Sequence, residues 1–171
     1  MMGCADKIYQ LNPRSPQGFQ MLGIMNYKYG DIGEAAKMLK ASWHFNRNDP
    51  VTLYFLATVF LNAGKTREAR NLAHRLAEID PIVATSQLIP TFVHYMEGDF
   101  SKAWQESEKV YELFSENPVI TFHRGLYAAA VKKQKQAIEY FDMNFQDHPE
   151  NLYGKLSFLM KLAMNGSKDM V

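Results

Sequence analysis

The sequence lacks the features that mark several classes of protein. It contains one cysteine, Cys4, in 171 residues, which excludes an internal disulfide and therefore a disulfide-stapled secreted scaffold. No apolar run reaches the roughly 18 to 20 residues of a membrane-spanning helix, and Met1 to Ile8 lacks the apolar stretch of a signal peptide. Basic and acidic residues nearly cancel, at 19 and 18, so no overall charge favours nucleic acid or an anionic membrane. These absences predict a cytoplasmic protein with no nucleic-acid partner and no membrane partner.

Motifs for catalysis and for cofactor or metal binding are also scarce. Cys4 has neither an adjacent histidine nor a Cys-x-x-Cys partner, and no Gly-x-Gly-x-x-Gly or Walker-type phosphate loop is present. No two of the five histidines have the spacing that would place them on one helical face as metal ligands. These histidines are His44, His74, His94, His123 and His148. We therefore expect no enzymatic activity, no cofactor and no metal.

What the sequence does contain is an internal period of 34 residues. With 47% apolar residues the chain has enough hydrophobic content for a buried core, and a fixed period means that this core is built from repeated units. Three columns of residues recur in one phase. They are Gly30, Gly64, Gly98 and Gly166, with Lys132 in the remaining slot; Ala35, Ala69, Ala103 and Ala137; and Pro13, Arg47, Pro81, Ser115 and Pro149.

Each period reads as two helices separated by the glycine. Ser15-Pro16, Asp49-Pro50 and Asn117-Pro118 combine a capping side chain with a proline suited to the first helical position. Asn151 falls in the same column, whereas Val83 cannot cap the third repeat. We expect Gly30, Gly64 and Gly98, in the left-handed conformation, to end the first helix of their periods. The second helices should then begin near Asp31, Thr66 and Asp99.

Small residues recur where two antiparallel helices must approach closely, at Gly23, Ala57 and Gly125 and in the alanine column. The pattern of Leu22-Gly23, Gly30-Asp31, Glu34-Ala35 and Asp80-Pro81, at a period of 34, resembles the tetratricopeptide repeat (TPR) family. The resemblance covers nearly the whole chain. It implies an all-α fold, a right-handed α-solenoid of antiparallel helix pairs with about ten helices.

In this register we expect one domain over 1–171. It consists of a partial repeat over 1–15, four repeats over 16–49, 50–83, 84–117 and 118–151, and a terminal helix over 152–166. The terminal helix has few charges and would expose apolar residues such as Phe158 and Leu159, although solenoids normally end on a polar face. We interpret the chain as a segment of a longer repeat protein, or as one that buries its ends against another copy.

Some positions depart from the family pattern. Pro90 falls inside the first helix of the third repeat, so we expect that helix to start late, near Thr85 or Ser86, or to kink. His94 and Arg124 are polar residues in columns that are otherwise mostly apolar, and we expect each to reach the rim or to find hydrogen bonds. The only tight basic cluster, Lys132, Lys133 and Lys135, is interpreted as a solvated turn.

The resemblance implies that the protein binds a peptide or a partner protein in a concave groove formed by the first helix of each repeat. The groove columns are mostly apolar and aromatic, which favours a partner segment with apolar anchors. Tyr54, Phe92, Tyr95 and Phe122 are the expected hot spots, because aromatic side chains combine contact area with a low ordering cost. The complete set of predicted groove residues is Gln20, Ile24, Tyr27, Tyr54, Thr58, Leu61, Leu88, Phe92, Tyr95, Phe122 and Leu126.

Family members that hold acidic chaperone tails use a carboxylate clamp of Lys, Arg and Asn. The corresponding positions here carry Gln20 and Ile24, then Phe55, then either Val119 and His123 or Thr85 and Ile89, so no such clamp is present. Two alternatives to a binding scaffold stay open. The chain could be the regulatory region of a larger bacterial signalling protein, such as a kinase, cyclase or transcription regulator, or a module that forms homo-oligomers through its terminal helices.

Overall fold

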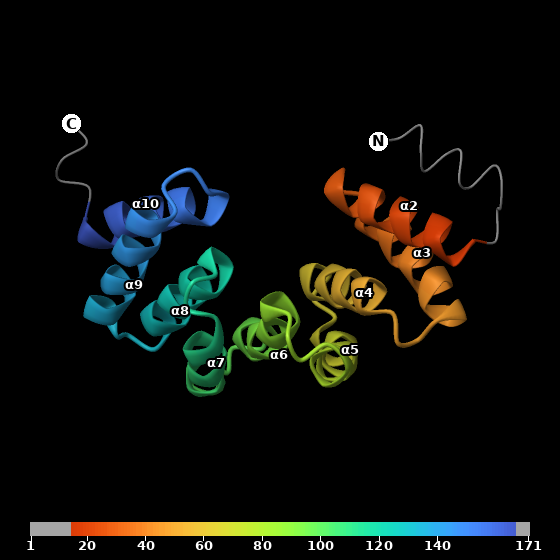
Figure 1. The fold of residues 1–171 in the computed structure, drawn as a ribbon, viewed down its shortest axis with the longest axis horizontal. Coiled ribbons are helices and arrows are strands. Elements are labelled where there is room, and N and C mark those ends of the chain that lie inside the picture. Colours follow the sequence, from red (N-terminus) through yellow and green to blue (C-terminus); the bar gives the residue numbers. More distant parts are fainter. Residues whose placement is uncertain (1–14, 167–171) are drawn as a thin grey trace. The chain divides into compact units, whose positions relative to one another are not determined.

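The structure is a computed structural model that describes residues 15–166, and within this range the chain forms α-helices joined by short turns, with no strand (Figure 1). Cys4 and most of the partial repeat predicted over 1–15 lie outside the described residues. The helices are α2 (Pro16–Lys28), α3 (Ile32–Phe45), α4 (Pro50–Asn62), α5 (Thr66–Ile79), α6 (Ala84–Met96), α7 (Phe100–Phe114), α8 (Pro118–Ala130), α9 (Gln134–Asp147) and α10 (Leu152–Asn165). The predicted all-α class is confirmed.

The helix starts follow the period of the sequence. The first helices begin at residues 16, 50, 84, 118 and 152, and the second helices at residues 32, 66, 100 and 134. Each step is 34 residues. The late start expected for α6 is therefore wrong, because this helix begins in register at Ala84 and runs through Pro90. Its first turn is tied to the end of α5, since Ser86 Oγ donates to Asp80 Oδ2 over 2.6 Å and Gln87 Nε2 donates to the Ala77 carbonyl over 2.9 Å.

The predicted caps are formed. The side chains of Ser15, Asp49, Asn117 and Asn151 each accept a hydrogen bond from a backbone N–H in the first turn of the following helix. These bonds satisfy donors that have no partner within the helix. The cap residues therefore fix where each first helix starts.

The turn after the first helix of each repeat requires a left-handed residue. Gly30, Gly64 and Gly98 adopt φ values of 86°, 70° and 81° there. Lys132 occupies the same place in the fourth repeat with a φ of 61°, and it is the only described non-glycine residue with a positive φ. Because a Cβ atom disfavours this conformation, the fourth turn carries backbone strain that the other three avoid.

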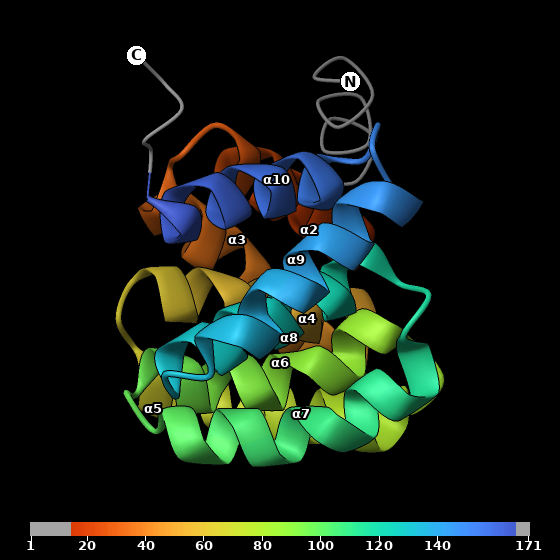
Figure 2. The same ribbon diagram turned by 90° about the vertical axis from the view of Figure 1, so that its left-hand side faces the viewer.

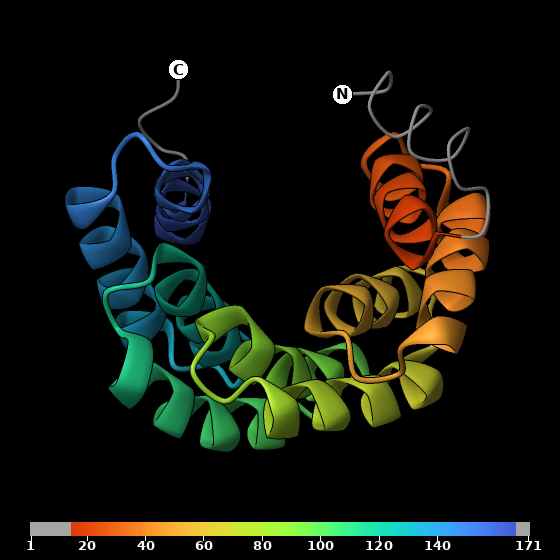
Figure 3. The same ribbon diagram turned by 45° about the vertical axis from the view of Figure 1, so that its right-hand side comes forward.

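The chain divides into two compact units, with the boundary between Met96 and Glu97. The described part of unit 1 runs from residue 15 to 96 and contains α2 to α6. Within it α4 contacts both α2 and α6, whereas α3 and α5 do not contact each other. The first helices of unit 1 therefore line the inner side of this unit and the second helices its outer side, as Figure 3 shows for the red to yellow-green part of the chain. We call these two sides the first-helix face and the second-helix face of unit 1.

The core of unit 1 is aliphatic. Leu39, Leu53, Leu56, Leu61 and Leu76 are buried and belong to one continuous cluster. The close approach of paired helices depends on the small residues of the repeat, with Ala35, Ala57 and Ala69 fully buried between them. Burial of these side chains supplies the main favourable term for folding this unit.

Unit 2 contains α7 to α10 from residue 97 onward. In it α8 contacts α7, α9 and α10, and α10 also packs on α9 (Figure 2). One core cluster of unit 2 is built on Phe122 and Phe141, Ile120 and Val110 are also buried in this unit, and two polar side chains, Arg124 and Asn144, are buried with them. Arg124 forms hydrogen bonds, as expected. His94 of unit 1 is also buried.

Candidate functional site

The predicted groove residues of unit 1 lie on α2, α4 and α6, but they are not equally accessible. Leu61 and Leu88 are buried, so they are core residues and not part of the surface. This corrects their assignment to the groove. The partly exposed members of the set are Gln20, Ile24, Tyr27, Tyr54, Thr58, Phe92 and Tyr95.

Two of these polar groups are occupied within the protein. Gln20 Nε2 donates to Asp49 Oδ1 over 2.5 Å and lies 2.9 Å from Thr52 Oγ1, so the amide links α2 to the start of α4. Thr58 Oγ1 donates to the Tyr54 carbonyl one turn earlier in α4, over 2.8 Å. Gln20 and Thr58 therefore stabilise the first-helix face by hydrogen bonds within the protein and contribute little to binding a ligand.

The first-helix face of unit 1 contains several partly exposed aromatic residues. Tyr27 and Tyr54 both meet Phe55 edge to face, with ring centroids 6.1 Å and 5.2 Å apart. Phe92 and Tyr95 of α6 stack with centroids 6.2 Å apart. Tyr27, Tyr54 and Phe92 pack against the core cluster while part of each ring stays exposed. Such rings are held in place before a ligand arrives, which lowers the entropy cost of binding.

A hollow of about 180 Å³ opens between the starts of α4 and α6. Val51, Tyr54 and Phe55 line it from α4, and Val83, Thr85 and Ser86 line it from the other side. Val51 is 45% exposed at its edge. The volume is below the range of sites for drug-sized molecules, so the hollow suits one side chain of a bound segment.

The predicted groove residues of unit 2 behave differently. Phe122 is buried because Tyr153 of α10 and Phe141 of α9 cover its ring, with centroids 5.5 Å and 5.9 Å away. Its assignment as an accessible hot spot is therefore wrong. Leu126 is partly exposed and packs against the same cluster. Beside Phe122, burial lowers the pKa of His123, and the contact between its Nδ1 atom and the Val119 carbonyl, 2.7 Å away, opposes this shift.

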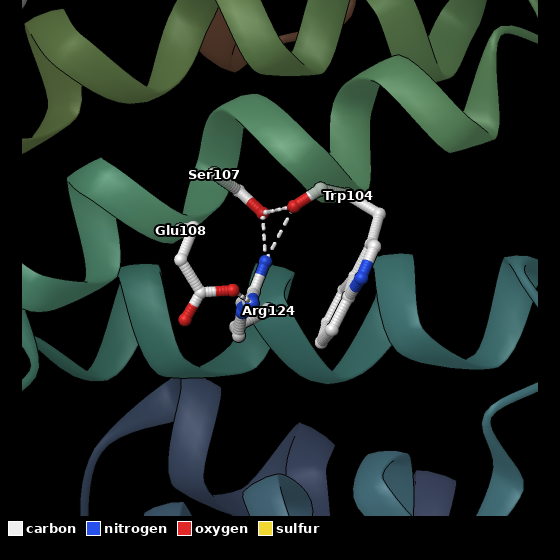
Figure 4. Close-up of polar contacts among 4 residues, drawn as sticks. All are labelled: Trp104, Ser107, Glu108 and Arg124. Carbon is white, nitrogen blue, oxygen red and sulfur yellow. Dashed lines mark hydrogen bonds and ion pairs between the residues drawn. The ribbon is translucent and has the colours of Figure 1, made fainter.

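Arg124 forms the most elaborate polar cluster of unit 2 (Figure 4). Its side chain is 1% exposed, and its guanidinium lies 3.4 Å from the centre of the Trp104 ring. Nη1 donates to the Trp104 carbonyl and to Ser107 Oγ, and Nη2 is paired with Glu108. Burial lowers the pKa of Arg124, yet an arginine stays protonated in proteins. This cluster joins α7 to α8 and is closed to a ligand.

Other kinds of site have little support in the part of the chain that the structure describes. Between residues 15 and 166 no group of three or more His, Cys, Asp and Glu side chains is placed to hold a metal ion. Among the helices described, none is both long and apolar enough to cross a membrane. Lys132 and Lys133 are exposed in the turn before α9, as expected, whereas Lys135 is exposed in the first turn of α9 itself.

No protein-family model matches the chain, and no curated protein matches its sequence. Solved structures do match. A thermophilic TPR protein of Thermus thermophilus, TTC0263, is similar with a TM-score of 0.80 at 15% identity, over 93% of this chain and 87% of that one. The fold is that of tetratricopeptide repeat proteins.

Two further structures support the same TPR fold. MamA from Desulfovibrio magneticus RS-1 has a TM-score of 0.71 at 16% identity, over 86% of this chain and 84% of that one. YrrB, described as a TPR protein with an unusual peptide-binding site, has a TM-score of 0.66 at 16% identity, over 91% and 80%. The resemblance inferred from the 34-residue period is thus confirmed at the level of the fold.

Sequence reasoning missed one feature of unit 1. The structure contains a cavity of about 640 Å³ on its second-helix face, larger than the hollow on the first-helix face. Trp43, Lys40 and Arg47 all line it from α3 and the turn that follows. Their spacing of three to four residues places them on one side of a helix, which is a signal that the sequence does contain. The cavity exists because α3 and α5 pack on α4 with a space between them, and the periodicity of the sequence does not predict this spacing.

Proposed function

We propose that this protein is a non-enzymatic scaffold that binds a segment of a partner protein on the first-helix face of unit 1. The observation that carries the proposal is the hollow beside Tyr54, which has the size of one anchor residue. Apolar side chains line most of it, together with the polar residues Asp80, Thr85 and Ser86. Phe92 and Tyr95 offer a second apolar contact on α6. YrrB shares the fold, and the peptide-binding site in its description makes a peptide ligand a reasonable expectation here.

The chemistry of this face favours apolar over acidic ligands. The positions at which TPR proteins with a carboxylate clamp carry cations are Gln20, Ile24 and Phe55 here, with Thr85 and Ile89 in the next repeat. None of these side chains is charged, and Ile89 is buried. Affinity would therefore come from burying one or two apolar anchors, in the manner of interface hot spots.

Charge substitutions at the surface of this face test the proposal. Val51→Glu combined with Tyr95→Glu places carboxylates in the hollow and on α6, where a bound apolar anchor would have to desolvate them. Affinity capture from the native host, followed by mass spectrometry, should lose the partner with this double variant. Leu113→Glu controls for an added carboxylate on the surface, because Leu113 is 73% exposed on the second helix α7 and lies outside the face.

Both variants must keep the helical circular dichroism of the parent protein. Loss of capture with Leu113→Glu as well, or retention with the double variant, would overturn the assignment of this face. A partner captured equally by all three proteins would have to bind elsewhere.

A second candidate function is self-association through α10. Leu152 and Leu159 are 65% and 59% exposed, and Phe158 is partly exposed beside Phe145, which matches the apolar surface expected of the terminal helix. Exposed apolar patches of this kind mark interaction sites. Sedimentation velocity at increasing protein concentration should show a mass that rises, and Leu159→Glu should suppress the rise. A monomer at every concentration would exclude this candidate.

A further inference from the structure

The second-helix face of unit 1 contains a cavity of about 640 Å³ between α3 and α5. These two helices lie apart on either side of α4, whose buried side chains form the floor between them. Leu53, Leu56 and Phe60 of α4 line this floor, and Trp43 of α3 and Leu72 of α5 line the sides. The volume lies within the range of binding sites for small molecules and peptide side chains.

This cavity and the proposed site on the first-helix face use opposite sides of one helix. Leu53, Leu56 and Phe60 are spaced at intervals of three and four residues, and so are Val51, Tyr54 and Thr58. The two sets are offset by two residues, which corresponds to about 200° around an α-helix. A ligand of the cavity would therefore leave the first-helix face free.

The rim of the cavity is basic. Lys40 of α3, Arg47 just after it and Arg75 of α5 line it, against one carboxylate, Glu68. Arg75 is already paired with Glu78. With Arg75 neutralised by Glu78, Lys40 and Arg47 outnumber Glu68, so the rim keeps a net positive charge.

Two of these cations have no carboxylate partner within the described residues. The Lys40 ammonium lies 5.3 Å from the centre of the Phe60 ring, and the Arg47 guanidinium lies 4.9 Å from the centre of the Trp43 ring. These cation–π contacts hold the charges beside the apolar floor. They also leave the N–H donors of both groups available to an incoming anion.

We propose that this cavity binds an acidic peptide segment of a partner protein, with an apolar side chain on the floor and carboxylates at the rim. Lys40 lies on α3 and Arg47 in the turn after it, so the two cations mark separate points of the rim, and a segment with several Asp or Glu residues can pair with both. Charge complementarity thus favours a peptide over a small anion. The site is independent of the one on the first-helix face, and the two differ in the charge of the ligand they select.

Fluorescence anisotropy with a labelled peptide tests this. The probe is a fluorescein-labelled nonapeptide in which Leu and Phe alternate with Asp and Glu, and its two controls replace either the acidic residues by Lys or the apolar residues by Ala. We expect saturable binding of the probe only. The affinity should fall with salt, because rim charges are screened.

Reversing the charges at the rim tests whether the peptide binds in this cavity. Lys40→Glu with Arg47→Glu should weaken it by at least about tenfold. The matched control, Lys28→Glu with Arg67→Glu, makes the same change in net charge at two exposed residues that do not line the cavity, and it should bind within about twofold of the parent. Val51→Glu with Tyr95→Glu should also bind normally, which separates this site from the proposed function.

Four outcomes would overturn the proposal. They are the absence of saturable binding, equal binding of the Lys-substituted peptide, equal weakening by the matched control, and loss of binding with Val51→Glu and Tyr95→Glu. A fifth would also overturn it and assign the cavity to a different occupant. If the parent self-associates and Lys40→Glu with Arg47→Glu abolishes that association, a second copy of the chain covers the cavity and not a partner protein.

Discussion

Unit 1 and unit 2 carry the same 34-residue period but fill their cores in different ways. In unit 1 the column that begins at Leu22 contains Leu56, buried in an aliphatic cluster. In unit 2 the same column contains Arg124, equally buried but surrounded by Trp104, Ser107 and Glu108. The helix positions hardly differ between the units, so the period is set by caps, turns and small residues more than by the identity of the large core residues.

The difference also explains why only one of the two first-helix surfaces is a candidate site. In unit 1 the aromatic rings of Tyr54 and Phe92 are left partly exposed. In unit 2 Tyr153 and Phe141 close over Phe122. The side chains of neighbouring helices thus decide which aromatic rings of the first helices stay accessible.

The largest expected effect on stability comes from truncating the buried side chain that the two units have at equivalent positions, Leu56 and Arg124. Leu56→Ala in unit 1 and Arg124→Ala in unit 2 should each lower the free energy of unfolding by about 2 to 4 kcal/mol, through lost contacts and a cavity. Urea unfolding followed by circular dichroism measures both. A cost below about 1 kcal/mol for Arg124→Ala would show that the cluster in Figure 4 does not stabilise unit 2.

Arg124→Leu gives unit 2 the residue that unit 1 has at the equivalent position, Leu56. Arg124→Leu should cost less than Arg124→Ala, because Ser107 Oγ donates to the Trp104 carbonyl over 3.0 Å and both groups keep a partner without the arginine. Glu108 is 51% exposed and can return to water. Buried ion pairs can often be replaced by apolar residues at little cost. An equal loss for the two variants would mean that the polar contacts themselves are required.

A smaller effect is expected at the turns. Lys132→Gly should raise the free energy of unfolding by about 1 kcal/mol, since it relieves a left-handed conformation that only glycine adopts freely. Gly98→Ala should lower it by about the same amount at the equivalent turn. Thermal unfolding of the two variants provides the comparison between these two turns of unit 2, and a destabilised Lys132→Gly would show that the turn before α9 needs the lysine side chain.

The smallest effect concerns pH. Burial lowers the pKa of His123 in the folded protein from its ordinary value of 6.5. The unfolded chain therefore binds this proton more readily, and the contribution of His123 to stability is present above about pH 6.5 and is lost as the pH falls toward the folded pKa. His123→Gln should flatten the pH dependence of the melting temperature in this window. An unchanged profile would exclude His123 as its source.

Much of the fold could be predicted from the sequence, because caps, turn glycines and small packing residues act locally and recur every 34 residues. The late start expected for α6 is wrong, because Pro90 lies well after the first turn of this helix, and Ser86 and Gln87 bond that turn to the end of α5. The candidate site was harder to predict. Periodicity identifies the helical face of Leu88 or Phe122, but it does not show whether a neighbouring helix covers that face.

Photo-crosslinking at Tyr54 shows whether a partner protein binds on the first-helix face of unit 1. A benzoylphenylalanine in place of Tyr54 lies at the hollow of the first-helix face, and the same group in place of Leu113 serves as an exposed control. The labelled protein is irradiated together with extract of the native host. We predict that the Tyr54 position, and not the Leu113 position, becomes linked to one partner, through a segment with an apolar residue at the cross-link. Cross-links at Leu113 alone, or none at Tyr54 from a protein that still captures its partner, would contradict the account.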